Sequence, residues 1–91
     1  MHSILVIVEM PSDNKTKEDS LAWSSALQEL RTVAENNKAV EDFGGNTWLI
    51  RAEGGLPFLT HLLSATEREK QRCRLLFFED EPKWVRSYQP D

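Results

Sequence analysis

Two uninterrupted apolar runs lie near the two ends of the chain. Residues Ile4–Val8 precede Glu9, and residues Leu75–Phe78 precede Glu79. A strand in a sheet with one wet face alternates apolar and polar residues, whereas every position in these two runs is apolar. We therefore expect two strands that are shielded from water on both faces. Because the chain has only 91 residues, we expect another protein surface to cover the second face of these strands.

Two amphipathic helices are predicted between these runs. Thr16 can cap the first helix, and Asn36-Asn37-Lys38 ends it, because asparagine tolerates a left-handed cap and lysine suits the negative end of the dipole. Gly54-Gly55 interrupts the chain before the second helix, which we expect to begin at Pro57. Apolar residues recur at helical spacing in both segments: Trp23, Ala26, Leu27, Leu30, Val33 and Ala34, then Leu56, Leu59, Leu62, Leu63 and Thr66.

Four strands complete the pattern. They are predicted at residues 4–9, 39–43, 47–52 and 73–80, with a hairpin at Gly44-Gly45-Asn46. The element order β-α-β-β-α-β is that of the ferredoxin-like split βαβ arrangement. We therefore predict an α+β fold with one four-stranded antiparallel sheet, in strand order 4-1-3-2, and both helices on one face.

The predicted domain spans residues 1–81, and a tail follows at residues 82–91. Trp84, Val85 and Tyr88 make this tail apolar for a free end. We expect it to pack on the sheet or on a partner subunit.

Alternation along the strands divides their side chains between two faces. The helix-facing set is predicted to be Ile4, Val6, Val8, Trp48, Ile50, Ala52, Cys73, Leu75 and Phe77. The centre of the opposite face then holds five large apolar residues: Leu5, Ile7, Leu49, Leu76 and Phe78. Contiguous apolar patches of this kind mark association surfaces in soluble proteins. The pattern predicts a homodimer that forms through this face, with the tail as an alternative or additional cover.

Composition narrows the function classes. The chain has 15 acidic and 11 basic residues and a net charge of -4, which argues against general nucleic-acid binding. Cys73 is the only cysteine, so no intramolecular disulfide can form, which suits the cytoplasm. The run Ile4–Val8 is too short for a signal peptide or a membrane helix.

Candidate chemistry is sparse. Glu9 and Glu79 end antiparallel strands, so they should lie about 20 Å apart at opposite ends of the sheet. No histidine or cysteine stands at metal-ligand spacing, and we predict no metal site. Lys70, Arg72 and Arg74 alternate before and into the last strand. They are compatible with a solvated turn plus a Glu9–Arg74 ion pair, or with a phosphate-binding patch for RNA.

One resemblance rests on two segments. Residues Ile4–Ser12 place an acid, Glu9, at the end of a strand before a Pro/Ser loop, and residues Asn46–Ile50 open another strand. This pattern resembles small ferredoxin-like endoribonucleases, namely the CRISPR-associated adaptation nucleases and the RNA-cleaving antitoxin of type V toxin–antitoxin systems. The resemblance implies a homodimer. In the CRISPR-associated branch it also implies a metal held at the interface by one acid from each subunit, and Glu9 would be that catalytic acid.

Three hypotheses follow. The leading one is a non-enzymatic cytoplasmic interaction or regulatory module that is homodimeric and needs no cofactor. The alternative is a small RNA-binding protein or endoribonuclease that uses Glu9, the three basic residues and Mg²⁺ or Mn²⁺. A third is a sheet face that binds a small apolar ligand. None of the three involves a membrane.

Overall fold

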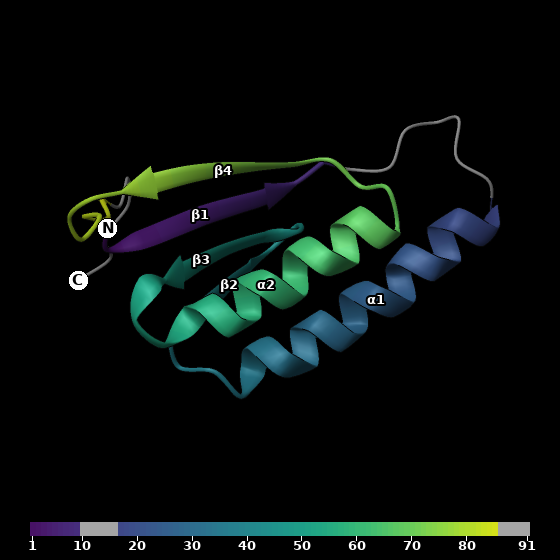
Figure 1. Ribbon diagram of the computed structural model, residues 1–91, viewed down its shortest axis with the longest axis horizontal. Helices are drawn as coiled ribbons and strands as arrows, with labels where there is room; N and C mark the ends of the chain where they lie inside the picture. Colours follow the sequence, from purple (N-terminus) through teal and green to yellow (C-terminus); the bar gives the residue numbers. More distant parts are fainter. Residues whose placement is uncertain (10–16, 86–91) are drawn as a thin grey trace, which may run out of the picture.

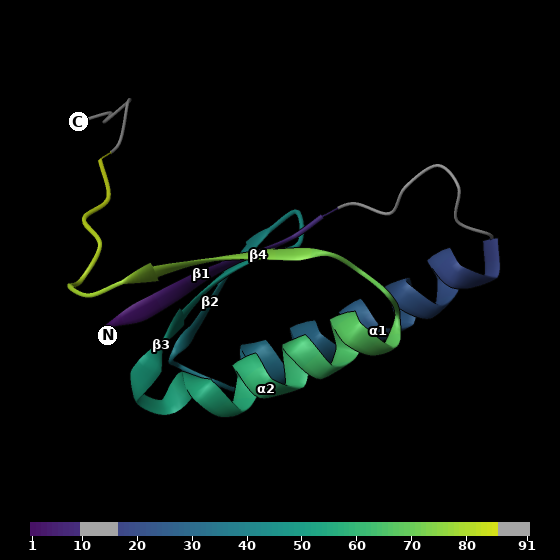
Figure 2. The ribbon, with the colours of Figure 1, turned by 45° about the horizontal axis from the view of Figure 1, so that its top comes forward.

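A computed structural model describes residues 1–9 and 17–85 of the chain. Its four strands form one antiparallel sheet in the order β2-β3-β1-β4, with both helices on one face (Figures 1 and 2). The elements are β1 (Ser3–Val8), α1 (Lys17–Glu35), β2 (Val40–Gly44), β3 (Thr47–Arg51), α2 (Ala52–Arg68) and β4 (Cys73–Phe78). The predicted α+β ferredoxin-like fold is confirmed, including its strand order.

The core lies between the helices and the inner face of the sheet. Alternation correctly places Ile4, Val6, Val8, Trp48 and Ile50 there, and all five are buried. The helices contribute the remaining buried apolar side chains: Trp23, Ala26, Leu30, Ala34, Phe58, Leu62 and Ala65. The Trp48 ring packs against that of Phe58 from α2 in a tilted arrangement, with a centroid distance of 6.2 Å.

Helix α1 begins with an acidic first turn, in which Glu18 and Asp19 face the positive end of the helix dipole. Its predicted cap, Thr16, lies outside the described residues. Beyond the helix, Asn37 connects two segments that are far apart in sequence. Its Oδ1 accepts the N–H of Ala39 at 2.9 Å, and its Nδ2 donates to the carbonyl of Gly54 at 3.2 Å. The α1–β2 turn is thereby fastened to the start of α2.

Helix α2 starts earlier than predicted. It spans Ala52–Arg68, with a kink at Glu53 and Gly54, and Pro57 lies in the first turn after the kink. Gly54 has φ +87°, which other residues adopt only with strain. A Cβ on Gly55 would lie 2.5 Å from Cγ2 of Ile50. The glycine pair therefore allows the chain to turn from β3 directly into a helix that packs closely on the sheet.

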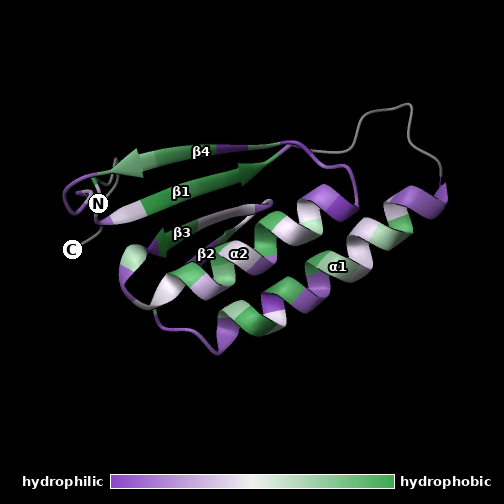
Figure 3. Cartoon of the chain, viewed as in Figure 1, coloured by the Kyte–Doolittle hydropathy of each residue, from purple (hydrophilic) through white to green (hydrophobic). Residues whose placement is uncertain are grey.

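The helices do not extend under the whole sheet. They pack mainly against β1, β2 and β3, and β4 lies beyond them (Figure 1). The prediction that Phe77 belongs to the core is therefore wrong, because its side chain points to the helix side but is 56% exposed. Cys73 and Leu75, on the same side, are only partly buried against the core. Figure 3 shows that most of β4 is nevertheless as apolar as the central strand β1.

Candidate functional site

The outer face of the sheet brings the five predicted interface residues together. Strand register aligns Leu49, Leu5 and Leu76 in one row across β3, β1 and β4. Neighbouring rows place Ile7 beside Arg74, and Ser3 beside Phe78. Exposure is uneven: Leu76 and Ile7 are 56% and 41% exposed, Leu5 and Phe78 are half-buried, and Leu49 is buried. The exposed part of this patch therefore lies over β1 and β4.

The segment after β4 partly covers the other half of this face. It leaves the sheet on the side opposite the helices (Figure 2). Trp84 meets Phe43 of β2 edge to face, with ring centroids 5.2 Å apart. Trp84 and Val85 remain largely exposed, and Tyr88 lies outside the described residues. The packing predicted for the tail at residues 82–91 as a whole stays a prediction.

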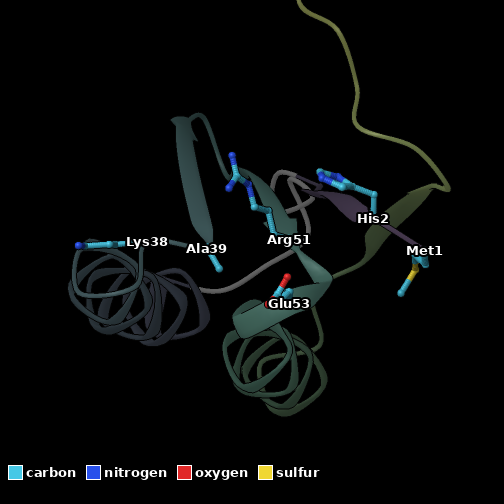
Figure 4. Close-up of a pocket in the computed structure, with 6 residues that line it drawn as sticks. All are labelled: Met1, His2, Lys38, Ala39, Arg51 and Glu53. Atoms are coloured by element: carbon cyan, nitrogen blue, oxygen red, sulfur yellow. The ribbon is translucent and has the colours of Figure 1, made fainter.

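Hollows surround Arg51 at the end of β3. One, of about 430 Å³, is lined by Met1, His2, Lys38, Ala39, Arg51 and Glu53 (Figure 4). Another, of about 250 Å³, is lined by His2, Ser3, Glu41, Leu49, Arg51, Glu81, Pro82 and Trp84. In Figure 4 the side chains of Arg51 and His2 rise on the same side of the sheet, whereas Lys38 points away from them.

This end of the sheet was not singled out from the sequence, because it combines the start of β1, the end of β3 and the segment after β4. The buried Ser3 Oγ and His2 Nδ1 have no hydrogen-bond partner in the described parts of the chain. Arg51 has no ion-pair partner there either. Glu41, Glu53 and Glu81 line the same hollows, so cationic and anionic groups are mixed and neither sign of ligand is favoured.

The three predicted basic residues do not form one row. Lys70 has φ +56° and ends α2: its N–H donates to the carbonyl of Glu67, and the N–H of Gln71 donates to that of Thr66. These two bonds form a Schellman motif, which stops the helix. The assumption that Lys70 lies in an extended stretch with Arg72 and Arg74 is therefore wrong. Lys70 instead lines a hollow with Asp19, Arg68 and Glu69.

Glu9 lies beside the start of β4. Its backbone N–H donates to the carbonyl of Arg72 at 2.7 Å, and its Oε1 accepts the Nε–H of Arg74 at 3.1 Å. The cross-strand ion pair considered from the sequence is thus present. Arg72, by contrast, has no ion-pair partner among residues 1–9 and 17–85. The role of these residues in RNA binding stays a prediction.

Glu79 is at the opposite end of the sheet, where it lies 3.5 Å from the N-terminal ammonium of Met1. Over the described ranges, no group of three histidines, cysteines or acids is placed to hold a metal. Neither described helix is long and apolar enough to cross a membrane. Comparison with protein-family models, curated proteins and solved structures found no match.

Proposed function

We propose that this protein is a cytoplasmic interaction module that needs no cofactor and forms a homodimer through the outer face of its sheet. The observation that carries the proposal is the exposure of Ile7 and Leu76 on adjacent strands, with the half-buried Leu5 paired directly to Leu76. Full burial of an aliphatic side chain is worth about 1.5–3 kcal/mol. Covering this patch would therefore offset a substantial part of the cost of association.

The surroundings of the patch also support association. Glu9 and Arg74 pair with each other at its border, so a second copy would not have to bury an isolated charge there. The segment that carries Trp84 lies towards β2, where the ring meets Phe43, and Ile7 and Leu76 stay exposed. A two-fold axis through the patch would place the same apolar residues against each other.

The test is the double variant Ile7→Lys, Leu76→Lys. It should be monomeric at concentrations where the wild type is dimeric, because like charges would be buried opposite their own copies. A matched control is Leu21→Lys, Leu56→Lys, which replaces two equally large exposed residues on the helices. Light scattering should find this control dimeric. A wild type that is monomeric at high micromolar concentration would contradict the proposal.

The nucleic-acid alternative retains one supporting observation. Arg72 and Arg74 are exposed two residues apart at the start of an edge strand, next to Glu9. Titration of labelled single-stranded RNA at low salt, with and without Mg²⁺, tests it. With only a few phosphate contacts, binding should be weak and strongly salt-dependent. Arg72→Gln, Arg74→Gln should abolish it, whereas Glu9→Gln should abolish only cleavage.

A further inference from the structure

Strand β4 is an edge strand, and the direction of its backbone groups can be assigned. Among residues 1–9 and 17–85, it pairs only with β1. The Glu9 N–H bond to the Arg72 carbonyl follows the same register as the β1–β4 ladder. Antiparallel strands alternate between residues that bond to the neighbour and residues that face away from it. Arg74, Leu76 and Phe78 therefore bond to β1.

The backbone groups of Cys73, Leu75 and Phe77 consequently point away from the sheet. No hydrogen bond to these N–H and C=O groups is present among residues 1–9 and 17–85. Such an edge is a template for another strand. Edges of this kind are usually blocked by lysine, proline or a bulge. β4 contains none of these, and Arg74 is its only charged residue.

The side chains along this edge are apolar on both sides of the sheet. Leu76 on the outer side and Phe77 on the helix side are each 56% exposed. An association through the outer face alone would cover Leu76 and leave Phe77 in water. Only a partner that extends the sheet in its own plane covers both.

We propose that this edge pairs, antiparallel, with the β4 edge of a second copy. The charges flanking β4 support a second copy as the occupant. Basic residues, Arg72 and Arg74, lie at its start, and Glu79-Asp80-Glu81 follows its end. Antiparallel self-pairing places the basic start of each strand beside the acidic end of the other. Parallel pairing of two copies would place like charges together.

The direction of the backbone groups limits the register of this pairing. Outward-facing residues bond to outward-facing residues, so Leu75 can pair with Cys73, Leu75 or Phe77 of the second copy. Pairing with Cys73 would place Arg74 opposite its own copy, whereas the other two registers place outward-facing apolar residues opposite each other and Arg74 opposite Leu76 or Phe78. The two-fold axis stands perpendicular to the sheet. The product is one continuous sheet of eight strands, with the helices of both copies on the same side.

This edge shares the Leu76 side chain with the outer-face patch of the proposed function, but its backbone groups form a different surface. Pairing through the edge leaves Ile7 exposed, and pairing through the outer face leaves the N–H groups of Leu75 and Phe77 free. The inference therefore does not rest on the proposed function, and one measurement separates the two.

The measurement is residue-resolved amide hydrogen exchange of the full chain at high and low protein concentration. Amides of Arg74, Leu76 and Phe78 should be protected at both concentrations. At high concentration, the amides of Leu75 and Phe77 should exchange at least about tenfold more slowly than at low concentration, because only strand addition gives them acceptors. Fast, concentration-independent exchange at Leu75 and Phe77 would overturn the inference. If the sample is nevertheless dimeric, this result would favour the outer-face dimer.

Two variants sharpen the result. Phe77→Lys places a blocking charge on an exposed edge position and should remove both the dimer and the extra protection. Ile7→Lys changes the outer face only, and it should keep the protection of Leu75 and Phe77. Circular dichroism verifies that both variants are folded. If Ile7→Lys loses the protection and Phe77→Lys retains it, edge pairing is wrong.

Discussion

The two edges of this sheet are built differently. At the β2 edge, the outward N–H of Val40 donates to the carbonyl of Asn37 at 3.1 Å, and Gly44 N–H donates to Oδ1 of Asp42 at 2.7 Å. The ladder with β3 is irregular between Asp42 and Gly44. The strand is also polar and exposed along most of its length. Its own chain thus occupies two of the N–H groups along this strand, those of Val40 and Gly44.

Within the described residues, the β4 edge has no such protection. The backbone groups of Leu75 and Phe77 face away from β1, and the side chains beside them are apolar. Proteins commonly protect edges against unwanted pairing, and in residues 1–9 and 17–85 such protection is present at β2 and not at β4. The comparison teaches that a single small sheet can combine a blocked edge with an open one, and that local hydrogen bonds distinguish them as clearly as hydropathy does.

The strongest way to break this comparison is to place proline at two adjacent, equally exposed positions of β4. Leu76→Pro removes an N–H that bonds to β1 and should lower the free energy of unfolding by about 3 kcal/mol or more. Phe77→Pro removes an outward N–H and should cost less than about 1 kcal/mol in the monomer. Urea denaturation at a concentration where the protein is monomeric measures both. Equal losses would contradict the assigned direction of the backbone groups.

A smaller effect is expected where the segment after β4 reaches the β2 side. Trp84→Ala removes the edge-to-face contact with Phe43 and should lower the free energy of unfolding by about 1–1.5 kcal/mol. Val85, which is 92% exposed, supplies the control, since Val85→Ala should leave the stability unchanged. Thermal denaturation compares the two. If they behave alike, the segment adds nothing to the protection of β2.

The β2 edge itself can be opened. Asp42→Ala removes the acceptor of the Gly44 N–H and should cost about 0.5–1 kcal/mol. The Gly44 amide should then exchange faster. Glu41→Ala is the matched control, because it removes a neighbouring exposed carboxylate for which no hydrogen bond is seen in the described ranges. Unchanged exchange at Gly44 in Asp42→Ala would show that Asp42 does not protect this edge.

The smallest effect concerns the ion pair at the start of β4. Arg74→Gln should lower the free energy of unfolding by about 0.2–0.5 kcal/mol, because Glu9 and Arg74 are both solvent-accessible. The difference from wild type should shrink in concentrated salt. Arg72→Gln, which removes an arginine without an ion-pair partner in the described chain, should have no such salt dependence. A loss that is insensitive to salt would indicate packing by the Arg74 stem instead.

Much of the fold could be predicted because each element carries its own signal. The apolar runs, the helical spacing of residues such as Trp23 and Leu30, and the glycine-rich turn at residues 44–46 are local, and together they fix the order and the strand pairing. Alternation also assigned β1 and β3 to the correct faces. For β4, alternation alone was not enough. It correctly gives the side of the sheet to which Phe77 points, but the burial of Phe77 depends on how far the helices extend beneath that side.

The candidate site was less accessible to prediction. The prediction for Lys70 was wrong because the end of α2 gives this residue a left-handed backbone conformation. Lys70 therefore does not belong to the extended stretch that contains Arg72 and Arg74. The hollows around Arg51 were missed because their walls combine the N-terminal residues, the α1–β2 turn, β2, β3, the start of α2 and the segment after β4. The protection of β2 by Asn37 and Asp42 depends on hydrogen bonds to specific backbone groups, and no periodicity in the sequence reports these.

The irregular ladder at Asp42 and Gly44 has a consequence for the size of any assembly. A growing fibre needs two complementary ends on every unit, so that each added unit offers a fresh edge to the next. In the edge dimer proposed above, the β4 edge of each copy would be occupied by the other, and β2 would form both outer edges of the enlarged sheet. An assembly that grew through the edges of this sheet would therefore stop at two copies, although its edge strand β4 is apolar.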